Sequence, residues 1–240
     1  KIAYAAKLNI DFIICDHHTT GETLPSSIAV LDPKRNDCLY PYKHLSGCGV
    51  GFKLLQAFSF KNDIAFSDFI PLLEYVTLSI ASDIVPITGE NRILAYYGLK
   101  QINTSPSIGL KEIINVCNLS DKEITISDIV FKIGPRINSS GRIKSASEVV
   151  ELLISNDVNF SRKKSEILNE YNNDRKNLDK NITDEAIQMI ANDKEYYKKK
   201  SIVVYQPHWH KGVLGIVASR LTDEYYKPAI VLGRSNGMVS

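Results

Sequence analysis

Ile10-Asp11-Phe12-Ile13-Ile14-Cys15 is an apolar run of strand length, and Asp16-His17-His18 follows it directly. A short helix is expected before this run, over residues 2–7, and a second strand after it, over residues 28–31. Helical patterns then take over, at residues 46–58, 67–81, 90–102 and 110–117. Strand signals that alternate with helical ones predict an α/β fold with a mainly parallel sheet.

The pattern changes over residues 161–192, where apolar side chains recur at helical spacing between charged ones and neither Pro nor Gly interrupts. A helix this long and polar is typical of a connection between domains. Beyond it we expect a strand at 201–205, a helix at 212–226 and a strand at 229–232. The sequence therefore predicts a first α/β domain over 1–157, an interdomain helix over 158–194 and a second, truncated α/β domain over 195–240.

The composition limits the classes of function that the chain can have. The 240 residues carry a net charge of +2, from 29 Lys and Arg against 27 Asp and Glu, so nucleic acid could be bound only through a local basic patch. No apolar run approaches the roughly 20 residues of a membrane span, so no membrane partner is expected. The four cysteines form no CxxC pair, which predicts a reducing cytoplasm and no thiolate zinc site.

Asp16-His17-His18 is the strongest chemical signal. Sites in open parallel sheets lie at the carboxyl ends of strands, where this triplet is expected. Imidazole accepts Mn²⁺ or Zn²⁺, and carboxylate prefers Mn²⁺ or Mg²⁺. The triplet therefore favours a divalent metal over the alternative, a polar loop whose histidines are satisfied by hydrogen bonds.

Asp83 gives a second signal. It ends a strongly apolar helix just before Pro86, where the helix dipole disfavours a carboxylate. Burial beside that helix costs free energy unless the carboxylate is paired or binds a metal. We therefore favour a ligand role over that of an ordinary helix-terminal residue.

The third signal is the segment 134–142, where two glycines, two serines, Asn138 and the guanidiniums of Arg136 and Arg142 lie within nine residues. Backbone N–H groups and Arg side chains recognise phosphate. The alternative is a surface loop, which composition alone favours.

These motifs, in this order, resemble the DHH phosphoesterase superfamily, and more narrowly its RecJ-like single-stranded-DNA-specific exonucleases. The segments that carry the resemblance are 16–18, 46–51, 81–86 with 90–92, 134–142 and 209–220. The long helix is also similar to the RecJ-like interdomain helix. The similarity covers essentially the whole chain.

The resemblance implies a two-metal phosphodiesterase with two Mn²⁺ or Mg²⁺ ions and the catalytic residues Asp16, His17, His18 and Asp83. It makes His17 and Asp83 metal ligands, and it has Asp16 orient the imidazole of His17 without binding the metal itself. His18 would contact the scissile phosphate. Substrate phosphates would be bound by Arg136, Asn138, Arg142 and His210.

The implied activity is 5′→3′ hydrolysis of single-stranded DNA to 5′-mononucleotides in repair and recombination, with a single-strand-binding protein and a helicase as partners. Two alternatives stay open: a DHH phosphodiesterase acting on oligoribonucleotides or cyclic dinucleotides, and an inactive DHH homologue that binds DNA as a scaffold. The family's paired upstream aspartates would precede Lys1, so residues 1–240 alone are expected to be inactive.

Overall fold

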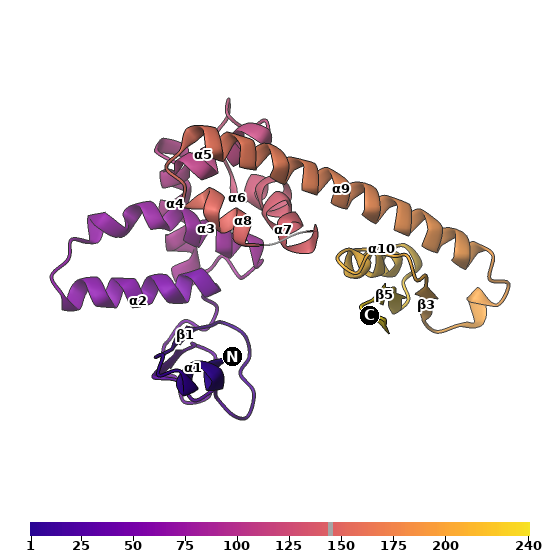
Figure 1. Cartoon of the computed structure of the whole chain (residues 1–240), viewed down its shortest axis with the longest axis horizontal. Helices are drawn as coiled ribbons and strands as arrows, with labels where there is room; N and C mark the ends of the chain where they lie inside the picture. The colour runs from indigo at the N-terminus through magenta and orange to yellow at the C-terminus, as the bar shows by residue number, and fades with distance from the viewer. Residues whose placement is uncertain (144–145) are drawn as a thin grey trace. The chain divides into compact units, whose positions relative to one another are not determined.

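The computed structural model describes residues 1–143 and 146–240, which form two compact units (Figure 1). Unit 1 comprises Lys1–Gly134 with Asn156–Val158, and unit 2 comprises Pro135–Ser155 with Asn159–Ser240. The long helix thus belongs almost entirely to unit 2. The domain boundaries expected from the sequence stay a prediction.

The strands of unit 1 form a short parallel pair after the first helix, α1 (Ile2–Lys7). Strand β1 (Ile13–Cys15) pairs with β2 (Ala29–Leu31), with Ile14 opposite Val30. The parallel arrangement is as predicted, although β1 begins three residues later than the apolar run. The Asp16 amide continues the ladder by donating to the Leu31 carbonyl at 3.0 Å, so the site triplet starts where the pair ends.

Helices make up most of unit 1. Ser46 begins α2 (Gly47–Lys61) as expected, and its hydroxyl accepts a hydrogen bond from the Gly49 amide at 3.2 Å. The helix expected over 67–81 differs: residues Phe66–Leu72 form a 3₁₀ segment, and α3 begins only at Leu73 and ends at Ser82. Pro71, which has no amide hydrogen to donate, lies inside the 3₁₀ segment.

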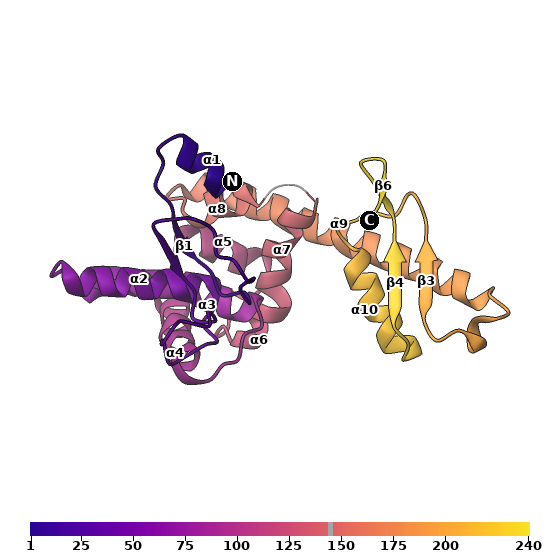
Figure 2. The same ribbon diagram turned by 90° about the horizontal axis from the view of Figure 1, so that it is seen from below.

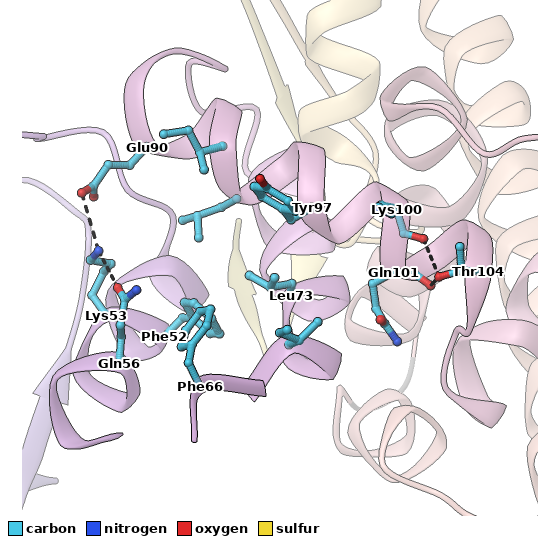
Figure 3. Close-up of a pocket in the computed structure, with 13 residues that line it drawn as sticks. Phe52, Lys53, Gln56, Phe66, Leu73, Glu90, Tyr97, Lys100, Gln101 and Thr104 are labelled. Atoms are coloured by element: carbon cyan, nitrogen blue, oxygen red, sulfur yellow. Dashed lines mark hydrogen bonds and ion pairs between the residues drawn. The ribbon is translucent and has the colours of Figure 1, made fainter. Parts of the chain in front are cut away.

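The core of unit 1 lies between α2, α3 and α4 (Gly89–Thr104) and includes Phe52, Val76, Ile80 and Ala95. The remaining helical segments are α5 (Ile108–Val116), α6 (Ile126–Asp128) and a π-helical turn (Ile129–Ile133). Figure 3 shows a cavity of about 540 Å³ beside this core, lined by Phe52, Phe66, Leu73 and Tyr97. Its lining includes none of the predicted site residues.

Asp128 is a buried anchor of the segment that leads into α7. Its carboxylate accepts from Lys122 Nζ at 2.7 Å, from Thr125 in a capping box and from Lys132 Nζ at 3.2 Å. These bonds, with the Lys122 contact largest, hold the pKa of Asp128 well below its ordinary value despite burial.

Replacing Asp128 by asparagine is expected to lower the free energy of unfolding by about 1–3 kcal/mol at pH 7, because two ammonium groups lose their partner. A lowered carboxyl pKa contributes stability above the unfolded value, about 3.9, and that contribution is lost as the pH falls through the folded value. Denaturant unfolding of both proteins from pH 7 to pH 3 should therefore show the difference narrowing only below about pH 4. A constant difference over this range would contradict the assignment.

Unit 2 is organised along one long helix, α9 (Val158–Ala191), whose 34 residues span about 51 Å. The C-terminal part of α9 packs on α10 (Leu214–Tyr225) and on the parallel pair β3 (Ile202–Tyr205) and β4 (Ala229–Leu232) (Figure 2). Trp209 and Val217 are buried in this core. All four elements lie close to the positions expected from the sequence.

The smaller elements of unit 2 are α7, which begins at the junction of the units (Gly134–Ile143), α8 (Ser147–Leu153), a 3₁₀ turn (Tyr196–Lys198) and an antiparallel pair, β5 (Arg234–Ser235) and β6 (Met238–Val239). Among the described residues, no helix is both long and apolar enough to span a membrane. All four cysteines are free thiols.

Candidate metal and phosphate site

His17 lies just beyond the end of β1, and its side chain is only 16% exposed. The first residue of α2 explains this burial: a Cβ on Gly47 would lie 3.4 Å from His17 Cδ2, so the helix terminus packs directly against the imidazole. Glycine at this position lets the backbone of α2 approach the ring. The sequence showed the run of small residues but not their contact with His17.

Asp83 follows the last residue of α3 as its C-cap, close to the helix end expected from the sequence, and it faces this histidine. Its Oδ2 lies 3.7 Å from His17 Nε2, and the carboxylate is 37% exposed. The Ser79 hydroxyl donates to Asp83 Oδ2 at 3.2 Å and accepts from the Cys48 amide at 3.4 Å, which links Asp83 to the first turn of α2. The structure therefore brings together the two residues that the resemblance makes metal ligands, although they are 66 positions apart.

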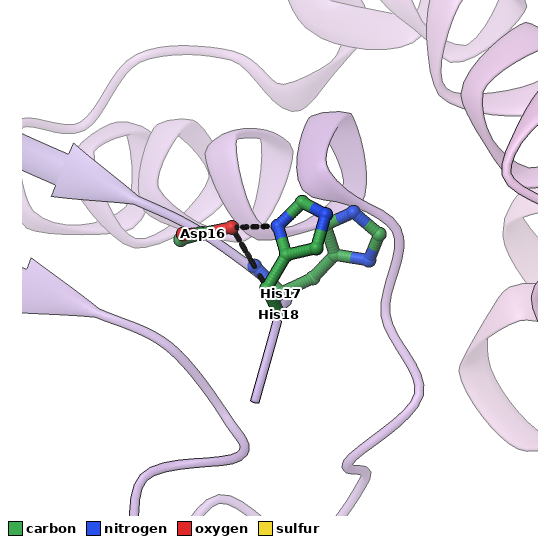
Figure 4. A group of neighbouring side chains, drawn as sticks. All are labelled: Asp16, His17 and His18. Atoms are coloured by element: carbon green, nitrogen blue, oxygen red, sulfur yellow. Dashed lines mark hydrogen bonds and ion pairs between the residues drawn. The ribbon is translucent and has the colours of Figure 1, made fainter. Parts of the chain in front are cut away.

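Asp16 has a different partner from the one expected. Its Oδ1 contacts His18 Nδ1 at 2.7 Å and accepts from the His17 backbone amide at 2.7 Å, so the carboxylate orients the ring of His18 and not that of His17 (Figure 4). Adjacent residues at a strand end point in different directions, and Asp16 and His18, two apart, share a side. The His18 contact is the main cause that lowers the pKa of Asp16.

The donor set fits a divalent cation. The 3.7 Å between His17 Nε2 and Asp83 Oδ2 is shorter than two ligand bonds of about 2.1 Å each, so one ion can bridge both atoms. One ligand atom each from Asp16, His17 and His18 also lies within 4.8 Å of the others. Within residues 1–143 and 146–240, His17 Nδ1 is buried and has no hydrogen-bond partner, whereas a metal-bound histidine usually donates its other nitrogen to an acceptor. The residues described supply a partial coordination sphere.

The turn that follows Asp83 has a strained backbone and is held by hydrogen bonds from α4. Ile84 has φ +52°, a left-handed conformation that is costly for a β-branched residue. Asn91, fully buried in the first turn of α4, donates to the Pro86 carbonyl at 3.0 Å and to the His44 carbonyl at 2.6 Å. A lone Asn in the sequence carried no signal of these two hydrogen bonds.

Cys48 lies near the same carboxylate. Burial, followed by the negative charge of Asp83, raises the pKa of its thiol to about 11. The thiol is therefore protonated at neutral pH, which disfavours Cys48 as a nucleophile.

The phosphate-binding candidates of the segment 134–142 lie on a helix, α7, and not on an open loop. Backbone amides within a helix donate to the helix's own carbonyls, so they are not free to bind phosphate. Any phosphate contact from this segment must therefore come from its side chains. Arg136 Nε donates to Asn169 of α9 at 2.9 Å, and Arg142 Nη1 donates to the Gly212 carbonyl at 2.9 Å. Asn138 is exposed.

His210 lies close to the same guanidinium. The Gly212 amide donates to His210 Nδ1 at 3.1 Å, while the Gly212 carbonyl accepts from Arg142. A Cβ on Gly212 would lie 2.6 Å from the Arg142 carbonyl oxygen, so only glycine fits. The structure thus gathers His210 and Arg142, two of the four predicted phosphate-binding residues, around one glycine.

Comparisons with known proteins show what the whole chain resembles. The DHH family, N-terminal domain, matches residues 1–80. The single-stranded-DNA-specific exonuclease RecJ of Haemophilus influenzae is 36% identical over 98% of this chain and 43% of its own length, and that of Bacillus subtilis is 37% identical over 95% and 28%. A crystal structure of RecJ in complex with Mn²⁺ from Thermus thermophilus superposes with a TM-score of 0.81 at 26% identity, covering 96% of this chain and 34% of that one.

The chain therefore resembles RecJ along most of its length, and its first 80 residues match the DHH family, N-terminal domain. The similarity to RecJ runs through both units, because each relative aligns with at least 95% of this chain. The chain spans less than half the length of the relatives it matches. The mixture of helices and short parallel sheets seen here is the architecture of the RecJ structures.

Proposed function

We propose that the protein of which this chain forms a part is a metal-dependent exonuclease that degrades single-stranded DNA from the 5′ end and releases 5′-mononucleotides. The observation that carries this proposal is the approach of His17 to Asp83 at the carboxyl end of β1, beside Asp16 and His18. The names of the RecJ relatives support the substrate class over the oligoribonucleotide and scaffold alternatives.

His17 and Asp83 would hold a divalent cation, Mn²⁺ or Mg²⁺, in a pair of ions completed by groups outside these residues. Such ions supply an activated water and stabilise charge on the attacked phosphate and on the leaving oxygen. Gly47 and Ser79 fix the two ligand side chains. Asp16 holds the ring of His18, which is exposed and therefore available to contact the scissile phosphate.

Arg136, Arg142, Asn138 and His210 would bind substrate phosphates. Replacing Arg136 and Arg142 together by alanine is expected to weaken binding of single strands and to flatten the slope of log affinity against log salt by about 1.4, at roughly 0.7 per phosphate contact. The loss should be nearly equal for all base sequences, because phosphate contacts carry no sequence information. Fluorescence anisotropy between 50 and 300 mM salt measures both effects.

The result that would contradict this role is an unchanged slope together with a lower melting temperature. Arg136 and Arg142 would then only hold α7 against Asn169 and Gly212, the partners they contact in the structure.

The whole function is tested with the full-length protein of which this chain forms a part. Single strands labelled at the 5′ or 3′ end are incubated with Mn²⁺, with Mg²⁺ or with a chelator. We expect labelled mononucleotide at once from the 5′-labelled strand, a ladder of shortened strands from the 3′-labelled one, and no hydrolysis with chelator or with duplex DNA. Equal hydrolysis of duplex, or hydrolysis that persists with chelator, would contradict the proposal.

The cellular setting belongs to the same proposal. A nuclease specific for single strands needs a source of them, so a helicase and a single-strand-binding protein are the partners we propose, in cytoplasmic repair and recombination. The free cysteines are consistent with a reducing compartment.

A further inference from the structure

One face of α9 carries a row of polar residues toward the middle of the helix. Asn169, Asn172, Arg175 and Asp179 are spaced three or four residues apart and therefore lie on the same side. Asn172 is 0% exposed and Asp179 is 1% exposed. Polar groups buried to this extent are normally hydrogen-bonded, so the row calls for partners from outside the helix.

Arginines from other elements of unit 2 converge on this row. Arg220 of α10 donates from Nη2 to Asp179 Oδ2 at 2.6 Å. Arg142 of α7 and Arg220 lie close enough to Arg175 for their charges to act on it: burial is the main cause that lowers the pKa of Arg175, and both neighbouring guanidiniums lower it further. Asp179 acts in the opposite sense. Arg220 is the guanidinium that pairs with Asp179, and the charges of Arg142 and Arg175 add to the positive charge of the cluster.

Two hydrogen-bond donors in this cluster lack an acceptor among the described residues. Arg175 Nε and Asn172 Nδ2 are both buried and have no hydrogen-bond partner among the described residues, although Arg175 Nη2 donates weakly to Asn172 Oδ1 at 3.4 Å. Excess positive charge and unsatisfied donors together are what a phosphate group requires, since its oxygens accept several charge-assisted hydrogen bonds. Helix α9 would then bind ligand itself, in addition to connecting domains.

We propose that Asn172 and Arg175 of α9, together with Arg142 and Arg220, form a binding site for a phosphate group. The inference rests on the proposed function for the source of that phosphate, which is the backbone of the single-stranded DNA. Arg142 is already expected to bind substrate, and Asn172, Arg175 and Arg220 extend that contact onto α9 and α10.

A competing arrangement uses the same residues for structure alone. Asp179 Oδ1 is also buried, with no hydrogen-bond partner in the part of the chain that the structure describes, and Arg175 lies one helical turn away from it on the same face. An internal Arg175–Asp179 ion pair would satisfy that oxygen and leave no site for a ligand. The two arrangements predict different effects of a new carboxylate at position 172 on the affinity for single-stranded DNA. A phosphate site would lose affinity, whereas an internal ion pair would leave the affinity unchanged.

The test uses the 240-residue chain and four proteins: wild type, Arg175→Ala, Asn172→Asp and the matched control Lys176→Ala. Lys176 is the adjacent residue on α9, exposed and equally charged. Affinity for fluorescent oligo-dT with a 5′-phosphate or a 5′-hydroxyl is measured over a range of salt. Melting temperature is measured with inorganic phosphate and with chloride at equal ionic strength.

We expect Arg175→Ala and Asn172→Asp each to weaken oligo-dT binding at least about tenfold and to flatten the salt slope by about 0.7, with less than about a twofold change in Lys176→Ala. The new carboxylate in Asn172→Asp can accept a hydrogen bond from Arg175, so this variant should keep the wild-type melting temperature. It therefore decides the question if Arg175→Ala is unstable.

Inorganic phosphate should raise the melting temperature of the wild type by about a few degrees and leave the melting temperatures of both variants unchanged. Equal losses for both oligonucleotides assign an internal phosphodiester, and a loss confined to the 5′-phosphorylated strand assigns the terminal phosphate.

Wild-type affinity and salt slope in Asn172→Asp would overturn the site, whether or not DNA binds elsewhere, and would favour the ion pair. Conversely, stabilisation by inorganic phosphate that depends on Arg175, in a chain that binds no oligo-dT, would uphold the phosphate site and count against the proposed substrate.

Discussion

Replacing His17 by alanine in the full-length protein is expected to reduce turnover on 5′-phosphorylated single strands by about 10³–10⁴-fold, which corresponds to about 4–5.5 kcal/mol of transition-state stabilisation. His17 Nε2 lies 3.7 Å from Asp83 Oδ2. Without the imidazole, the metal ion would lose its nitrogen ligand at this position and would be held here by Asp83 alone. Single-turnover hydrolysis at saturating Mn²⁺ measures the effect.

A matched control replaces His208, an exposed histidine of unit 2 that contacts Glu185 at 2.9 Å. His208→Ala should keep turnover within about twofold, and both variants should melt within a few degrees of the wild type. Near-normal turnover in His17→Ala would contradict the ligand role, and so would an equal loss in the control.

Replacing Gly98 by alanine is expected to give the largest loss of stability, roughly 3 kcal/mol, or about 10 °C in melting temperature. Gly98 of α4 is so close to α3 that an added Cβ would overlap Thr77 Oγ1 and the Leu73 carbonyl oxygen. The carbonyl is backbone, so the clash is relieved only if the helices separate. Because Asp83 is the C-cap residue of α3, this separation should also weaken metal binding.

Gly51 of α2 provides the control, since a Cβ there meets nothing within 4 Å. Gly51→Ala should stabilise the chain by about 0.5–1 kcal/mol through helix propensity. Differential scanning calorimetry on both variants separates packing from propensity. Unchanged stability in Gly98→Ala would show that α3 and α4 do not pack as closely as described.

Apolar periodicity in the sequence predicted most of the fold. The strand before Asp16, the cap at Ser46 and the strand over Ala29–Leu31 all follow from local patterns that the tertiary structure reinforces. The triplet and Asp83 could be singled out because polar residues at a strand end and at a helix C-terminus conflict with local preference. The distance between them could not be predicted, because it depends on how α3 packs on α2.

Other features had no local signal. Gly134, Pro135 and Gly141 are poor helix formers, yet α7 is helical, and burial of Ser139 and Ser140 shows that packing overrides propensity there. The buried face of α9 around Asn172 is polar, so a search for apolar periodicity gives those positions no weight. Contacts such as Asp16 with His18 depend on side-chain direction, which spacing alone does not give.

The most direct test of the account is the position of bound Mn²⁺ in crystals of the chain, located by anomalous scattering at the manganese edge. The account predicts a peak about 2.0–2.3 Å from both His17 Nε2 and Asp83 Oδ2, which disappears in Asp83→Asn crystals. A peak that persists in Asp83→Asn, or Mn²⁺ bound only by Asp16 and His18, would contradict the assignment of His17 and Asp83 as the metal ligands.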